Sequence, residues 1–132
     1  MRFVLSIGLM LFFMGAGAQS LNTDTIGSAS KADNIYNRSA FSDSLASSFV
    51  IVIRKEVKAH RHAAHSEHVM VLEGEGHMRL GENSFNIKKG DLVFIPKNTI
   101  HSVKCTGKMP LKVLSVQSPM FDGKDRIMAE EK

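Results

Sequence analysis

Short apolar stretches separated by turn residues fill most of the chain from residue 49 onward. They include F-V-I-V-I from residue 49, L-V-F-I from residue 92 and L-K-V-L-S-V-Q from residue 111. β-Branched and aromatic residues favour strands, whereas the Gly, Pro and Asn residues between the stretches favour tight turns. No segment past residue 46 shows a sustained helical period. The pattern predicts an all-β sandwich or barrel.

Two histidines that are two residues apart mark a candidate metal site. His60 and His62 would project to the same face of an extended strand, because side chains alternate along a strand. Glu67 follows a run of small residues that allows the chain to turn and bring a carboxylate back toward the pair. Two imidazoles and a carboxylate suit Zn, Mn, Fe, Ni or Cu better than Ca or Mg.

A third histidine, His101, follows the apolar stretch that Pro96 ends. An imidazole arriving from this distant strand would close the coordination sphere around a metal. The alternative is a barrel interior whose polar side chains form hydrogen bonds without a metal.

These stretches resemble the two sequence motifs of the cupin family. The first motif reads G-x5-H-x-H-x3,4-E-x6-G, and the chain matches it from the first histidine onward, at His60, His62, Glu67 and Gly74. The second reads G-x5-P-x-G-x2-H-x3-N, and the matching positions are Gly90, Pro96 and His101. The resemblance runs from about Phe49 to about Phe121.

Three motif positions differ from the cupin pattern. Arg54 stands at the first glycine, Asn98 at a later glycine and Cys105 at the final asparagine. The Asn98 substitution is mild, because Asn adopts the left-handed backbone more readily than most residues. No metal ligand of the family sits at the position of Cys105.

The cupin resemblance implies a double-stranded β-helix, a small jelly-roll barrel whose inner face holds a divalent transition metal. The implied ligands are His60, His62, Glu67 and His101, with the metal being Mn, Fe, Zn, Ni or Cu. It also implies a metalloenzyme with dioxygenase- or isomerase-like chemistry on a small organic acid, sugar or phenol, with Glu67 as ligand and candidate base. The alternative is a non-catalytic module that binds a small ligand. A homodimer would fit the family and would cover exposed strand edges.

The N-terminal region has the pattern of a secretory signal peptide. Arg2 precedes an apolar run from Phe3 to Met14, and an A-x-A arrangement predicts cleavage after Ala18. We therefore expect a periplasmic or secreted protein without a stable membrane anchor after cleavage. Residues 19–45 form a polar, partly disordered segment in this interpretation, with residues 19–32 as a mobile tether and residues 35–45 docking at an edge. Residues 46–122 form the cupin domain, and residues 123–132 form a C-terminal tail.

Composition argues against a nucleic-acid-binding protein. The net charge is +4, but the charges alternate in sign along the chain, and with no Trp and only one Tyr there is little aromatic surface on which bases could stack.

Several other residues carry weaker expectations. We expect Cys105, the only cysteine, to be a half-buried strand residue near a turn. His65 and His68 flank Glu67 and are interpreted mainly as surface residues, with His65 the better candidate for supporting a metal ligand. His77 is expected at the surface, and Gln117 can face the cavity. Seven apolar residues are expected in the core or cavity wall: Phe49, Ile51, Met70, Leu72, Phe94, Ile95 and Val113.

Overall fold

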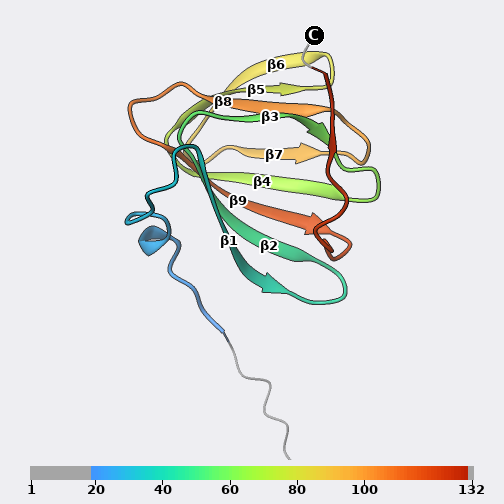
Figure 1. Cartoon of the computed structure of the whole chain (residues 1–132), viewed down its shortest axis with the longest axis horizontal. Coiled ribbons are helices and arrows are strands. Elements are labelled where there is room, and N and C mark those ends of the chain that lie inside the picture. The colour runs from blue at the N-terminus through green and yellow to red at the C-terminus, as the bar shows by residue number, and fades with distance from the viewer. Residues whose placement is uncertain (1–18, 131–132) are drawn as a thin grey trace, which may run out of the picture.

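The computed structural model describes residues 19–130 as an all-β barrel (Figure 1). Apart from the short 3-10 helix η1 (Thr23–Thr25), its described elements are strands. The strands are β1 (Ile35–Ser42), β2 (Ser47–Ile53), β3 (Glu56–Arg61), β4 (Ser66–Glu73), β5 (Glu75–Leu80), β6 (Asn83–Lys88), β7 (Leu92–Ile95), β8 (His101–Cys105), β9 (Leu111–Ser118) and β10 (Ile127–Met128). The all-β prediction is confirmed, whereas the expected signal peptide lies outside the described residues.

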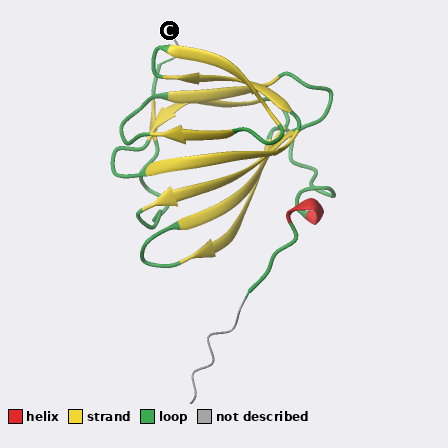
Figure 2. Cartoon of the chain, turned by 180° about the vertical axis from the view of Figure 1, so that it is seen from behind, coloured by secondary structure: helices red, strands yellow, loops and turns green. Residues whose placement is uncertain are grey.

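The strands form two five-stranded antiparallel sheets that enclose the interior of the barrel. One sheet has the order β1-β2-β9-β4-β7, and the other has the order β10-β3-β8-β5-β6. Seen from behind, η1 lies outside the strands, in the part of the chain that precedes β1 (Figure 2). Since sheet neighbours such as β4 and β9 are far apart in sequence, residues of the site come from distant parts of the chain.

Alternation along the strands decides which apolar residues reach the core. On β4, Val69 and Val71 point inward and are buried, whereas Met70 between them is 40% exposed. On β7, Ile95 is buried and Phe94 is 52% exposed. The core prediction was therefore wrong for Met70 and Phe94, because their neighbours occupy the inward positions of a strand with a two-residue period.

The polar N-terminal segment is partly packed against the outside of the first sheet. Ile26 is 1% exposed, and Arg54 donates hydrogen bonds to the carbonyls of Ala32 (3.0 Å) and Ser30 (2.9 Å). The arginine at the motif's first glycine position thus holds this segment in place. The edge position expected for residues 35–45 corresponds to β1, which pairs only with β2 in the described sheet.

Two turns have the backbone that their residues favour. Asn98, between β7 and β8, has a φ of 62°, as expected from its place at a motif glycine. Gly74, between β4 and β5, has a φ of 79°, and a Cβ there would lie 2.5 Å from the carbonyl oxygen of Pro110. Only glycine fits this second position without strain.

The end of the chain differs from the expected tail. Residues 127–128 form β10, which pairs with β3 so that Met128 lies opposite His60. The backbone N–H of Ala129 also donates to the carbonyl of Ala59 at 2.9 Å. Ile127 and Met128 alone give too short a pattern for a strand to be predicted. Their pairing with β3 brings residues 119–128, here called the C-terminal segment, across the site.

Within residues 19–130, the structure has no helix with the length and apolar character needed to span a bilayer.

Candidate metal site in the barrel

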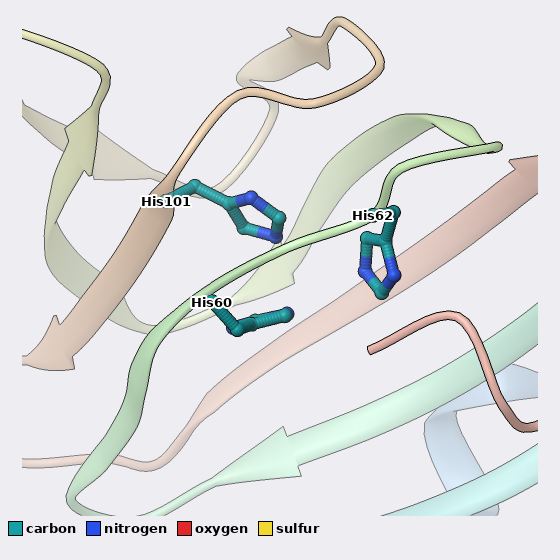
Figure 3. A group of neighbouring side chains, drawn as sticks. All are labelled: His60, His62 and His101. Atoms are coloured by element: carbon teal, nitrogen blue, oxygen red, sulfur yellow. The ribbon is translucent and has the colours of Figure 1, made fainter. Parts of the chain in front are cut away.

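Three buried histidines meet inside the barrel. His60 lies next to the last residue of β3, opposite His101, which begins β8, and His62 follows just after the end of β3. Each is 4–5% exposed, and one ring nitrogen from each lies within 4.8 Å of the others. Figure 3 shows the three rings turned toward a common space, His60 from β3, His62 from the loop that follows it and His101 from β8. The structure thus brings together the three histidines that the sequence singled out.

Backbone carbonyls fix the tautomer of all three rings. The Nδ1 atom of His60 donates to the carbonyl of Lys58 at 2.8 Å, and that of His101 donates to the carbonyl of Thr99 at 3.0 Å. His62 donates from Nδ1 to the carbonyl of Asp125. A carbonyl oxygen can only accept, so each Nδ1 carries a proton and each Nε2 keeps a lone pair for a metal.

Glu67 lies next to the histidine cluster. One carboxylate oxygen, Oε2, is 3.5 Å from Nε2 of His62 and 3.6 Å from Nε2 of His101. The other oxygen, Oε1, accepts a hydrogen bond from the hydroxyl of Ser115 at 2.5 Å. Ser115 shares a face of β9 with Gln117, because side chains alternate along a strand, but no sequence pattern indicates its contact with Glu67.

The site shifts the pKa of its ionisable groups in opposite directions. Burial, together with the nearby His101, lowers the pKa of His60 to about 4. Burial would also lower the pKa of His62, but its contact with Glu67 and its bond to the Asp125 carbonyl outweigh burial and raise it. Burial alone would raise the pKa of Glu67, but contacts with His101 and His62 and the Ser115 bond hold it well below its usual range. Glu67 is therefore an anion at this site.

The donor set fits a divalent transition metal. Three imidazole nitrogens, on rings oriented by backbone carbonyls, and one buried carboxylate form a mixed nitrogen and oxygen site, which suits Zn, Mn, Fe, Ni or Cu. The three histidines can hold the ion by themselves, and the carboxylate stands beside them as a candidate fourth ligand.

The C-terminal segment supplies a residue that sequence reasoning missed. The carboxylate of Asp125 accepts from the backbone N–H groups of Ala63 and Ala64, both at 2.8 Å, and of His65 at 3.2 Å. It also accepts from Nδ1 of His65 at 2.5 Å. These bonds hold its own pKa well below the usual range of an aspartic acid, although burial opposes this effect. No sequence signal links Asp125 to a loop about sixty residues upstream.

The remaining histidines take different positions. His65 is 5% exposed and bonded to Asp125, so the prediction that it lies at the surface was wrong. His68 points outward and packs against Phe94, with ring centroids 4.9 Å apart. His77 is exposed and bonded to Asn86 at 2.8 Å, as expected for a surface residue. Cys105 is half-buried, as expected.

The cluster opens into a largely apolar cavity of about 140 Å³. Its apolar walls include Phe49, Ile51, Ile95, Val113 and Phe121. Polar groups reach it from Gln117, Asn37 and Arg126. The expectation that Gln117 faces the cavity is confirmed, whereas Arg126 belongs to the stretch that was expected to be a tail.

Comparisons with known proteins identify the family. Residues 49–117 match the model of the cupin domain. The chain belongs to the cupin family. Among curated relatives, the uncharacterized protein MJ1618 of Methanocaldococcus jannaschii is 36% identical over 97 residues, which cover 74% of this chain and 75% of that protein.

Solved structures support the same fold. A Klebsiella pneumoniae protein with a double-stranded β-helix domain aligns with a TM-score of 0.74 at 18% identity, covering 87% of this chain and all of that one. Pac13 of Streptomyces, a nucleoside dehydratase, aligns with a TM-score of 0.63 at 18% identity, covering 74% of this chain and 79% of Pac13. The expected double-stranded β-helix is thereby confirmed, and at these identities the likeness concerns the fold alone.

Proposed function

We propose that this cupin is a metal-dependent enzyme that acts on a small organic substrate by proton transfer, as in isomerase-like chemistry. The observation that supports this best is the set of three Nε2 atoms, each freed for a metal by a backbone carbonyl at Nδ1, beside a buried carboxylate. This set borders a cavity large enough for a small organic molecule.

Different residues of the chain would have different roles in such a reaction. His60, His62 and His101 would hold the metal, which supplies Lewis acidity to a bound oxygen of the substrate. Glu67 Oε2 faces the cluster and is the atom placed to take a proton, while Ser115 holds the other oxygen in position. The apolar walls formed by residues such as Phe49 and Phe121 would limit the contact of this atom with water.

A non-catalytic ligand-binding module is the second candidate, and one observation favours it. The contacts that lower the pKa of Glu67 make its carboxylate a weak base, since proton affinity falls with pKa. A binding module needs only the charge and position of this carboxylate.

Isotope exchange separates the two candidates. The protein, loaded in turn with Zn, Mn and Fe, is incubated in D2O with small organic acids, sugars and phenols, and exchange is followed by proton NMR. An enzyme of the proposed kind exchanges a substrate proton, and Glu67→Gln, which keeps the shape but not the base, abolishes this exchange. His77→Gln is the matched control, because His77 lies at the surface. Binding without exchange by any of the metal forms would support the module instead, and oxygen uptake would indicate dioxygenase-like chemistry.

We further propose that the protein is exported to the periplasm or secreted. The support is the charged, apolar and small-residue pattern of residues 1–18. N-terminal sequencing of the protein from its native cells would find Gln19 first, whereas a retained Met1 would contradict export by this signal.

A further inference from the structure

The side chain of Gln117 is buried at the cavity, and its amide oxygen receives no hydrogen bond from any residue in the range 19–130. Gln117 is 7% exposed and lies on β9 directly opposite Glu67 of β4. Within the described residues, Oε1 of Gln117 is the buried side-chain atom that has no hydrogen-bond partner. Leaving a buried amide oxygen without a donor costs ~1–3 kcal/mol, so a ligand that donates to it would recover that loss.

A positive charge stands at the same cavity. Arg126 lines it from the C-terminal segment, is exposed, and makes no ion pair with another described residue. A guanidinium in this position suits a carboxylate, to which it can donate two parallel hydrogen bonds.

The dimensions and walls of the cavity limit what can reach both groups. Its volume of about 140 Å³ is close to that of an engineered apolar cavity that takes benzene. Its lining is mostly apolar, with side chains such as Ile51 and Phe121 between the polar ones. The occupant therefore has a small apolar body, one hydrogen-bond donor and one negative charge.

We infer that Gln117 and Arg126 form a subsite for a small hydroxy acid, whose hydroxyl donates to Oε1 of Gln117 and whose carboxylate pairs with Arg126. This inference rests on the proposed function, since the subsite borders the histidine cluster and would present the acid to it. It narrows the substrate class from small organic molecules in general to hydroxy acids.

Matched pairs of acids test the hydroxyl contact. Binding of 3-hydroxybutyrate and butyrate, and of 4-hydroxybenzoate and benzoate, is measured by calorimetry and by the side-chain amide signals of glutamine in NMR. We expect at least one hydroxy acid to bind roughly tenfold more tightly than its deoxy partner and to shift the Gln117 signal. Gln117→Leu should remove this preference. Equal binding of both partners in each pair, or no binding by any of them, would overturn the inference.

Thermal unfolding separates a ligand contact from a structural role. Because Gln117→Leu replaces an unsatisfied buried amide with an apolar group of similar size, the metal-free variant should unfold at the same or a higher temperature than the parent. A lower unfolding temperature would mean that the amide supports the fold, and would overturn the inference.

Arg126→Gln tests the charge contact. It should weaken both members of each pair by a similar factor and make binding less sensitive to salt, because an exposed charge is screened by salt. Lys124→Gln is the matched control, since it removes one positive charge from the same segment. An equal loss in both variants would overturn a specific role for Arg126.

Each titration is run on metal-free protein and on protein supplied with one equivalent of zinc, with zinc retention measured in the same samples. Failure to retain zinc contradicts the proposed function, whereas loss of the hydroxyl preference contradicts the subsite, so the two failures are distinct.

Discussion

Replacing Asp125 with alanine removes the acceptor that joins the C-terminal segment to the loop after β3. Four hydrogen bonds to the carboxylate are lost, three from backbone N–H groups and one from the ring of His65. The side chain is 13% exposed. His62 is affected as well, because its Nδ1 donates to the backbone carbonyl of Asp125, which the side-chain bonds hold in place.

The structure sets the expected size of this effect. A hydrogen bond to a charged group contributes ~1.5–3 kcal/mol to stability. The four bonds do not add fully, because Ala63 and Ala64 are exposed and water can reach their freed N–H groups. We expect Asp125→Ala to lower the free energy of unfolding by about 2–3 kcal/mol, which is a fall of roughly 6–12 °C in the unfolding temperature. Zinc affinity should fall by about 10- to 100-fold, as for other losses of a group that orients a metal ligand.

Thermal unfolding and zinc competition with a chelator measure the two effects. Asp122→Ala is the control, since Asp122 lies in the same segment and accepts from the nearby N–H of Lys124 at 2.9 Å. Unchanged stability and zinc affinity in Asp125→Ala, or equal losses in the two variants, would refute the reasoning.

The stability that the Asp125 carboxylate contributes should also depend on pH. Because the folded protein lowers the pKa of this carboxyl, the unfolded state binds its proton first as the pH falls. The stabilisation is therefore complete above the ordinary aspartic-acid pKa of about 4 and is lost below it as the pH approaches the folded value. The part of the stability difference between the parent and Asp125→Ala that comes from this carboxylate should shrink as the pH falls below about 4.

Two further substitutions test the site and the fold. Ser115→Ala removes the hydroxyl that donates to Oε1 of Glu67. This change should lower zinc affinity by roughly tenfold. Unchanged affinity in a zinc competition assay would mean that the hydroxyl does not position the carboxylate. Gly74→Ala forces a Cβ to within 2.5 Å of a backbone oxygen at a φ of +79°, whereas at Gly90, with a φ of +94°, no atom lies within 4 Å of the added carbon. Gly90→Ala should cost about 1–2 kcal/mol and Gly74→Ala clearly more, so equal falls in the unfolding temperature would contradict the packing at Gly74.

The three clustered histidines were predictable because their signal is local. A two-residue spacing places His60 and His62 on one face, and the strand ended by Pro96 delivers His101. The same period, applied strictly, also puts Glu67, Val69 and Val71 on the inner face and leaves Met70 outside. The prediction for Met70 was wrong because an apolar side chain is buried only where the two-residue period of the strand points it inward.

The residues that were missed depend on the path of the chain after β9. Asp125 and Arg126 lie in a polar stretch with turn residues, and nothing in their own neighbourhood distinguishes them from a free tail. They reach the site because β10 pairs with β3, a contact between segments more than sixty residues apart. Ile26 is a similar case, since it is buried within a polar segment that Arg54 ties down a few residues later.

Metal content tests the central claim most directly. The protein is purified without a polyhistidine tag, exposed to zinc, freed of unbound ions by gel filtration and analysed by mass spectrometry for metals, beside His62→Ala, Glu67→Ala and His77→Ala. We expect about one zinc per chain in the parent and in His77→Ala, none in His62→Ala, and a reduced amount in Glu67→Ala. A parent protein that retains no metal, or a His62→Ala variant that retains as much as the parent, would contradict a metal site built on these histidines.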